Sequence, residues 1–410
     1  MPQTQASEGI EVVPHDTRIL HLMRKTKLKI CHVITRMIVG GAQENTLLTA
    51  IGHLKKGHEV TLVTGPSPGP EGELLKTRNI SGLKIVTNPH LVREISPYHD
   101  LAAYFSLKKF FKASAFDVVH THSSKAGVIG RLAADAAGIP FIAHTVHGQA
   151  FHRYEKPWKN FIYRKSEKIA ARHCHRIFAV AQAMVDQCVA AKIADPSKYK
   201  VVYSGMELEP YLNSKPDCEL RKKLGIPENA PVIGTVARLF PLKGYEDLMP
   251  AAKVVARKHP EVCFLVVGDG ILKDKITKEA EEAGMKFFFA GLVPPSDVHK
   301  YTALMDVLVH LSLREGLPRA VVQALASGKP AVAFRLDGTP EVVIDGRTGY
   351  LAEPGDVNTV GGRLIRLIEN KGESVRMGDE GRKLVSELFD WRKMADILED
   401  EYIKGLESGK

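Results

Sequence analysis

The 410-residue chain has no apolar segment long enough to cross a bilayer, no low-complexity tract and no repeat of solenoid length. These absences argue against an integral membrane protein and against a repeat array. Cysteine is scarce and odd in number, with no Cys-x-x-Cys pair among Cys31, Cys174, Cys188, Cys218 and Cys263. We therefore expect neither a disulfide framework nor a zinc ribbon, and a cytoplasmic location.

The amino terminus lacks the pattern of an export signal. Residues Met1 to His15 are polar and acidic, without a basic start followed by a long apolar run,. We expect residues 1–24 to be a disordered lead-in.

Lysine and arginine outnumber the acidic residues, which gives the chain a net charge of +10. This charge attracts anions of any kind, and no recognition motif supports binding to nucleic acid. Much of the excess lies between Arg153 and Arg176, where basic residues are interleaved with Trp158, Phe161 and Tyr163. The segment is either a solvated helix face or a surface that docks peripherally on anionic lipid at the inner face of the membrane.

Short β-branched runs alternate with helical patterns in two series, which predicts βαβ units around parallel sheets. Helices are predicted at 43–55 and 128–137, and the two series are separated by the stretch 208–217. The predicted strands are 29–34, 59–63, 117–121, 141–146 and 177–180, then 232–236, 263–267, 287–289, 307–310 and 331–333. Ligands of such sheets bind in the loops after the strands, so we expect the chemistry in a cleft between the two units.

The loop after the first predicted strand contains Gly40 and Gly41 and opens into a helix. Paired glycines let backbone amides approach a phosphate closely, and a helix N-terminus favours an anion. A plain tight turn has the same sequence, and the loop is neither a dinucleotide fingerprint nor a P-loop.

Two loops of the second series carry similar hints. Arg238 and Lys243 follow a predicted strand, and a guanidinium and an ammonium group together suit a diphosphate. Gly268 and Gly270 follow the next strand, where the backbone can lie against a flat or anionic ligand,. Each signal is weak alone, because basic loop residues are usually only solvated.

The stretch from Leu313 to Pro330 is the most informative. It resembles the signature of the family 4 glycosyltransferases, in which a Glu, here Glu315, is followed after seven residues by a second Glu on a helix that ends in Gly-x-Pro. The similarity extends through Gly338-Thr-Pro-Glu341 and back to the loops described above, in family order. The second acidic position is Gln323 here. An amide can still hold ribose hydroxyls, but it has no proton with which to act as an acid.

The resemblance implies a fold: an α/β protein with two Rossmann-like domains facing across a cleft, known as GT-B. Residues 25–208 would form the acceptor domain and residues 217–390 the nucleotide-sugar donor domain. A terminal helix at 391–406 would pack back on the first domain.

The resemblance also implies transfer with retention from a nucleotide-diphosphate sugar to an acceptor hydroxyl, in the synthesis of cell-surface polysaccharide or glycolipid. The acceptor would be a lipid-linked sugar or a saccharide. Neither a cofactor nor a metal would be needed. Arg238 and Lys243 would neutralise the departing diphosphate, with Gly40, Gly41, Gly268 and Gly270 against the donor.

The remaining roles concern the sugar and the ribose. Glu315 would orient the donor sugar, with the amides of Gly316 and Leu317 close by, and Gln323 would hold the ribose. His147, which ends a predicted strand, would contact the donor sugar, as a histidine of the family does.

The sequence is also compatible with other sites and other activities. His120 and His122 share one face of a strand and could bind a metal or line a cleft, but no third ligand has recognisable spacing. A nucleotide-sugar epimerase or hydrolase of the same architecture, a phosphorylase with pyridoxal phosphate, and a non-enzymatic binding module are the alternatives to a transferase.

Overall fold

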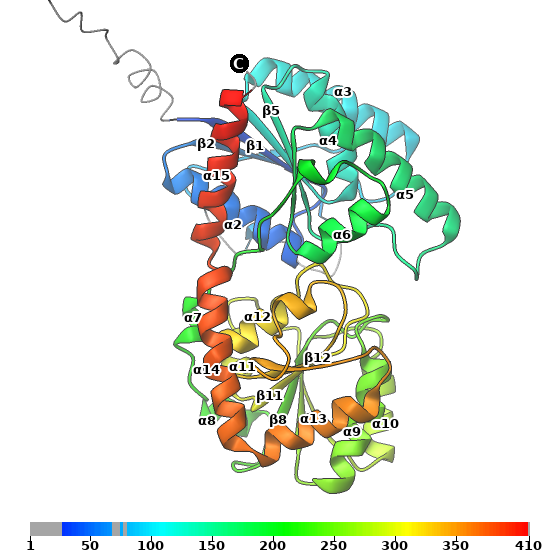
Figure 1. Ribbon diagram of the computed structural model, residues 1–410, viewed down its shortest axis with the longest axis vertical. Coiled ribbons are helices and arrows are strands. Elements are labelled where there is room, and N and C mark those ends of the chain that lie inside the picture. Colours follow the sequence, from blue (N-terminus) through cyan, green and yellow to red (C-terminus); the bar gives the residue numbers. More distant parts are fainter. Residues whose placement is uncertain (1–26, 68–73, 77–79, 409–410) are drawn as a thin grey trace, which may run out of the picture.

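The computed structural model describes residues 27–67, 74–76 and 80–408, and the predicted lead-in of residues 1–24 lies outside them. Two parallel sheets organise the chain, one above the other in Figure 1. The first has the strand order β3-β2-β1-β4-β5-β6-β7 and the second β10-β9-β8-β11-β12-β13. In both, the order reverses beside the first strand, which is where open α/β sheets bind their ligands.

The strands are short and mostly buried, as strands covered on both faces by helices must be. Those of the first sheet are β1 Lys29–Ile34, β2 Glu59–Thr64, β3 Lys84–Thr87, β4 Val118–His122, β5 Phe141–Val146, β6 Arg176–Ala179 and β7 Tyr199–Val201. Those of the second are β8 Val232–Val236, β9 Cys263–Val267, β10 Lys286–Gly291, β11 Val307–His310, β12 Ala331–Phe334 and β13 Gly349–Ala352.

Helices connect the strands. The first unit, built around β1 to β7, contains α2 Gly41–Lys55, α3 Pro97–Ser114, α4 Ser124–Asp135, α5 Pro157–Ala170 and α6 Gln182–Ala190, with the 3-10 turns Leu74–Lys76, Ala171–His173 and Pro196–Lys198. The second unit, built around β8 to β13, contains α7 Glu209–Leu212, α8 Cys218–Lys223, α9 Tyr245–Lys258, α10 Lys273–Glu282, α11 Val298–Ala303, α12 Arg319–Ala326, α13 Val357–Glu369 and α14 Lys371–Leu388, with the 3-10 turn Thr339–Glu341.

The last helix, α15 Trp391–Ser408, follows the second unit but packs against α2 and β5 of the first (Figure 1). Its buried face includes Trp391, Leu398 and Tyr402. The approach to α2 is close, because a Cβ on Gly52 would lie 2.4 Å from the Cβ of Ala395. A side chain at position 52 would therefore push the two helices apart.

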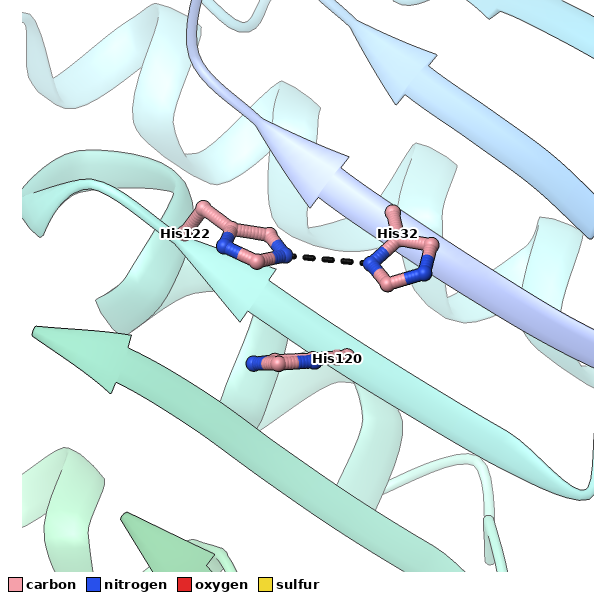
Figure 2. Close-up of side chains that lie close together, drawn as sticks. All are labelled: His32, His120 and His122. Atoms are coloured by element: carbon pink, nitrogen blue, oxygen red, sulfur yellow. Dashed lines mark hydrogen bonds between the residues drawn. The ribbon is translucent and has the colours of Figure 1, made fainter. Parts of the chain in front are cut away.

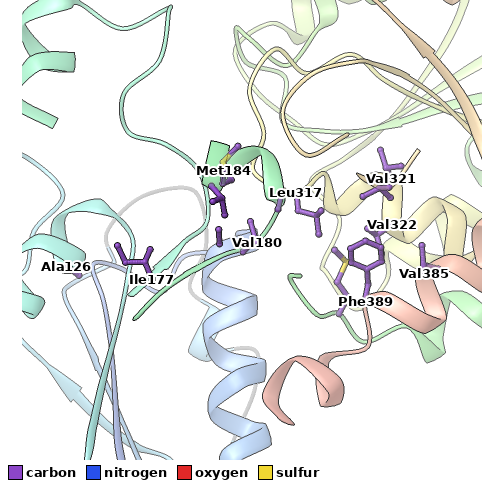
Figure 3. Packing of buried hydrophobic residues seen from close by; sticks show 14 of the residues in the cluster. Ala126, Ile177, Val180, Met184, Leu317, Val321, Val322, Val385 and Phe389 are labelled. Carbon is purple, nitrogen blue, oxygen red and sulfur yellow. The ribbon is translucent and has the colours of Figure 1, made fainter. Parts of the chain in front are cut away.

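The hydrophobic core is continuous between the units. One cluster of buried residues contains Val180 and Met184 of the first unit together with Leu317, Val321 and Phe389 of the second. Figure 3 shows Leu317 between these two groups, on the side that faces Val180 and Met184. The shared core holds the carboxyl ends of the two sheets close to one another, and the polar cleft described next opens beside it.

Candidate active site

A cleft of about 480 Å³ is lined by both units. Every residue of the predicted site lines it except Gly268 and Gly270. The lining predicted residues are Gly40, Gly41, His147, Arg238, Lys243, Glu315, Gly316, Leu317 and Gln323. The structure thus brings together loops that lie up to 283 positions apart in the chain, from Gly40 to Gln323.

The Gly40–Gly41 loop is the first-unit wall of this cleft. Gly40 precedes α2, and Glu44 in the first turn of that helix forms an ion pair with Arg319 at the start of α12. A Cβ on Gly41 would lie 2.7 Å from Cδ of Arg319. The glycine therefore permits the loop of one unit to touch the helix of the other.

Gly268 and Gly270 do not line this cleft, and their contact with the donor stays a prediction. Both have positive φ, at 145° and 157°, and a Cβ on them would lie 2.1 Å from the carbonyl oxygen of Ala237 and 2.4 Å from that of Leu239. They pack behind the loop that carries Arg238 rather than lining the cleft. Their contribution to the site is to let this loop lie close to the neighbouring strand end.

The loop between β8 and α9 is held in an unusual conformation. Leu242 has a φ of 67°, and its carbonyl accepts a hydrogen bond of 2.9 Å from the backbone N–H of Leu313. Gly244, with a φ of 82°, would place a Cβ 2.1 Å from the carbonyl oxygen of Leu311. A left-handed leucine costs on the order of 1 kcal/mol or more and persists only where its surroundings hold it. These backbone contacts fix the loop and place Lys243 beside the Glu315 loop.

Lys243 and Glu315 form an ion pair, with 2.7 Å between Nζ and Oε1. The backbone N–H of Glu315 also donates to Oδ2 of Asp337 at 2.8 Å. Burial alone raises the pKa of Glu315, but the Lys243 ammonium and His310 outweigh it, so the pKa lies below its ordinary value. Glu315 is therefore ionised at neutral pH, and it can accept hydrogen bonds from hydroxyls but cannot donate a proton.

His147 follows β5 and faces the Glu315 loop from the first unit. A Cβ on Gly316 would lie 1.9 Å from the carbonyl oxygen of His147, so the two backbones are in contact. Nε2 of His147 is 3.0 Å from Nδ1 of His122. Burial, and then the Arg319 charge, lower the pKa of His147 to about 3. The imidazole is neutral at physiological pH.

Gln323 lies on α12, close enough to the hydroxyl of buried Tyr211 for its amide to act on the pKa of that group. The amide can donate to this hydroxyl and still offer its oxygen to the cleft. Its assignment to the ribose stays a prediction.

Polar contacts between the units were not foreseen from the sequence. The carboxylate of Glu341 accepts from the backbone N–H groups of Gln182 and Ala183, at 2.8 and 3.0 Å, and so caps α6 of the opposite unit. Gln187 donates to Asp337 at 2.8 Å. Glu341 belongs to the Gly-Thr-Pro-Glu stretch noted in the sequence, and this stretch was the only sequence feature that pointed to these contacts. These contacts between the units help to keep the Glu315 loop next to His147.

The paired histidines His120 and His122 are joined by His32 of β1, and the ligand atoms of the three lie within 4.8 Å of one another (Figure 2). Each ring nitrogen nevertheless has a protein partner. His122 bonds to His32 at 3.1 Å and to His147, while His120 bonds to Tyr402 at 2.5 Å and to Thr145 at 2.7 Å. A metal here would have to replace these bonds.

Two family models match the chain and together cover most of it. The model described as glycosyl transferase 4-like domain matches residues 40–205, and the model described as glycosyl transferases group 1 matches residues 217–384. The chain is a glycosyltransferase with one domain of each kind. None of the alternative activities considered from the sequence is supported by these matches.

Curated proteins that are similar to this chain are named as glycosyltransferases. The UDP-Gal:alpha-D-GlcNAc-diphosphoundecaprenol alpha-1,3-galactosyltransferase of Escherichia coli is 29% identical over 92% of this chain and 97% of its own. The putative glycosyltransferase EpsD of Bacillus subtilis is 29% identical over 74% of this chain and 82% of its own. The assignment to polysaccharide or glycolipid synthesis rests on such relatives.

Solved structures share the fold of the glycosyltransferase. Anabaena HepE in complex with UDP has a TM-score of 0.77 at 22% identity, covering 92% of this chain and all of the other. Sucrose-phosphate synthase from Thermosynechococcus elongatus has a TM-score of 0.76 at 17% identity and covers 93% of this chain and 100% of its own. The predicted GT-B fold is confirmed.

Proposed function

We propose that the glycosyltransferase moves a sugar, with retention at the anomeric carbon, from a nucleotide-diphosphate donor to an acceptor hydroxyl. The observation that supports this proposal is that Lys243, Glu315 and His147 line the same cleft. Lys243 and Glu315 of the second unit are paired at 2.7 Å, and His147 of the first unit lies against the loop of Gly316. Cations, an ionised carboxylate and a neutral imidazole are the groups that a diphosphate and a sugar require.

The charges of the cleft set the roles of its residues. Arg238 and Lys243 stabilise the negative charge that builds on the departing diphosphate, a task that fixed charges perform without a metal. Glu315 accepts hydrogen bonds from sugar hydroxyls, since it is held ionised. With no protonated carboxyl group at the neighbouring position Gln323, the departing phosphate oxygen takes the proton of the acceptor hydroxyl.

A second pocket, of about 520 Å³, is proposed as the acceptor site. It shares Gln43 with the donor cleft, so the two are neighbours. Its cationic residues are Arg36, Arg93, Lys125 and Arg314. Lys125 is paired with Asp100 at 2.6 Å, and Glu155 and Glu167 also line the pocket, so these carboxylates offset most of this charge. The remaining positive charge suits an acceptor with a phosphate or diphosphate group, such as a lipid-linked sugar.

The mouth of this pocket lies beside an exposed apolar and basic surface on α3 and α5, which flank α4 (Figure 1). Tyr98 is 72% exposed on α3, and Trp158 and Phe161 are 57% and 65% exposed on α5. Lys159 and Lys165 lie over the rings of Trp158 and Phe161. Exposed aromatic and basic side chains together suit the headgroup region of an anionic membrane, where a lipid-linked acceptor would be met. No helix of the described residues is of a length and apolarity that would let it cross a bilayer.

Two measurements test the proposed reaction. Melting temperatures with UDP-, GDP- and ADP-sugars identify the donor, because a ligand of the native state stabilises it. NMR of the product then gives the anomeric configuration. Retention from a nucleotide-sugar donor is expected, and an inverted product or a donor without a diphosphate contradicts the proposal.

A further inference from the structure

Each carboxylate that lines the donor cleft is paired with a cation. Among the described residues, the lining side chains that are charged at neutral pH are Glu44, Arg238, Lys243, Glu315 and Arg319. Lys243 pairs with Glu315, and Arg319 of α12 pairs with Glu44 of α2, which belongs to the opposite unit. Three cations against two carboxylates leave the lining with a net positive charge, as a site for a diphosphate needs.

Glu44 lies at the end of α2 that faces the cleft. The backbone N–H of Glu44 donates to the carbonyl oxygen of Gly40 at 3.0 Å, and this is the first hydrogen bond of the helix. The N–H groups of Gly41, Ala42 and Gln43 therefore have no partner carbonyl within the helix, and all three residues line the cleft,. A helix end of this kind carries a partial positive charge that attracts phosphate.

The same partial charge attracts the carboxylate of Glu44, because an acidic side chain in the first turn interacts favourably with the helix dipole,. An unpaired Glu44 would therefore oppose a diphosphate in two ways, by offsetting the charge of the helix end and by repelling the phosphate directly. At an effective dielectric constant of about 20, a unit charge roughly 10 Å from another changes its binding about tenfold. A carboxylate at this place is compatible with a tightly bound anion only if a cation neutralises it.

Arg319 supplies that cation from the opposite unit. Its Nη2 bonds to Oε2 of Glu44, and no second carboxylate pairs with Arg319 within the part of the chain that the structure describes. The two side chains are only 16% and 20% exposed, so solvent screens this pair less than it screens a pair on the surface,. The stem of Arg319 lies against Gly41, where a Cβ would come within 2.7 Å of Cδ. The neutralising charge is therefore held beside the glycine loop.

We propose that Arg319 is a positioning residue of the donor site, which neutralises Glu44 and so keeps the N-terminus of α2 available for the diphosphate. The inference rests on the proposed function, in which the donor carries a diphosphate. Arg319 acts through Glu44 and does not touch the phosphate, because Nη2 is held by the carboxylate and Nη1 is buried. The net charge of the pair, and not the bridge that it forms between the units, sets the affinity for the diphosphate.

Calorimetry with inorganic diphosphate and with UDP, GDP and ADP tests this inference on the wild type, Arg319→Ala, Glu44→Gln and the double variant. Arg319→Ala should bind diphosphate about tenfold more weakly, because it leaves the carboxylate of Glu44 uncompensated. Glu44→Gln should bind it at least as tightly as the wild type. The double variant should return to within about threefold of the wild type, since the cleft regains its net charge although the ion pair is lost.

The double variant separates neutralisation from two other roles of Arg319. If the pair served only to hold the units together, all three variants would lose affinity. If Arg319 touched the phosphate, the double variant would stay as weak as Arg319→Ala. Arg347→Ala is the matched control, because it removes an arginine that pairs with Glu380 at 2.9 Å, and neither residue lines the cleft. Its affinity for diphosphate should equal that of the wild type.

Equal affinity in Arg319→Ala and the wild type, or a double variant as weak as Arg319→Ala, overturns the proposal. A wild-type protein that does not bind inorganic diphosphate overturns it as well. If Arg319→Ala does not fold, Glu44→Gln still decides, because weaker binding in that variant contradicts a competing carboxylate. Inorganic diphosphate contains no sugar and no base. If it binds in the expected order while no nucleotide sugar binds, the proposed function fails and the role of Arg319 stands.

Discussion

Nζ of Lys243 lies 2.7 Å from Oε1 of Glu315, so the cation proposed for the diphosphate also controls the ionisation of the carboxylate proposed for the sugar. Burial acts to raise the pKa of Glu315, and Lys243 is the largest influence that lowers it. The two residues are therefore coupled, and changing one changes the chemistry of both.

Lys243→Ala should have two effects. Loss of a charged hydrogen bond to the diphosphate should weaken nucleotide binding by about 2 kcal/mol. In addition, the pKa of Glu315 should rise, because burial then acts with less opposition, so the acid limb of the kcat/KM profile should move to higher pH. Calorimetry and a pH profile measure these effects.

Arg238→Ala should weaken nucleotide binding similarly but move the acid limb less than Lys243→Ala does, because the Lys243 ammonium is the largest influence that lowers the pKa of Glu315. Lys278→Ala is a suitable control, since Lys278 pairs only loosely with Glu282 on α10 at 3.9 Å. Wild-type nucleotide affinity in both cleft variants would show that the diphosphate lies elsewhere.

Gln323→Glu should remain active, with donor affinity changed by less than about tenfold, because a carboxylate can also hold ribose hydroxyls. Tyr211 is available as a hydrogen-bond donor to the new carboxylate. Steady-state kinetics measure both constants. A fall of several orders of magnitude in kcat with unchanged nucleotide affinity would mean that position 323 takes part in the chemistry.

The surface on α3 and α5 should bind vesicles that contain anionic lipid, with binding lost at high salt and absent with neutral lipid. Replacing both Tyr98 and Phe161 with Ser should reduce the sedimented fraction several-fold, because each buries apolar surface in the headgroup region. Val375→Ser, at a 62% exposed position on α14, is the matched control. Equal sedimentation with neutral and anionic vesicles would rule out the docking surface.

The buried histidines should make the fold sensitive to acid. The pKa of His32 is lowered by burial from 6.5 to about 3, so the unfolded state takes up this proton before the folded state as the pH falls. Below about pH 6.5 this residue alone should remove up to about 1.4 kcal/mol of unfolding free energy per pH unit. Urea unfolding between pH 7 and 5 measures the slope, which should be shallower in His32→Asn. A midpoint that does not change over this range would contradict burial of neutral histidines.

Much of the fold could be predicted, because buried β-branched runs mark the central strands. The predicted bounds of β1, β5, β8, β9 and β11 agree with the structure. The edge strands β3, β7 and β13 were missed. They have three or four residues each, and β3 is largely exposed, so they lack the long buried run on which the prediction rested.

The site was predictable only in part. The family signature pointed to Glu315, and the loops after strands pointed to Lys243 and His147, all of which line the cleft. The hydrogen bond between His53 and His32 could not be foreseen, because a helix residue and a strand residue 21 positions apart meet only once the helix packs on the sheet. The assignment of Gly268 and Gly270 to the donor stays a prediction, and the sequence did not show that their positive φ also serves close contact with Ala237 and Leu239.

Nucleotide affinity and turnover, measured side by side for Glu315→Gln and His147→Ala, test the assignment of the cleft most directly. Both residues contact the sugar rather than the diphosphate in the proposed complex, and their hydrogen bonds count most in the transition state. Turnover should therefore fall about a hundredfold in each variant, with nucleotide affinity within about threefold of wild type. Wild-type turnover in both variants, at normal nucleotide affinity, would contradict the assignment.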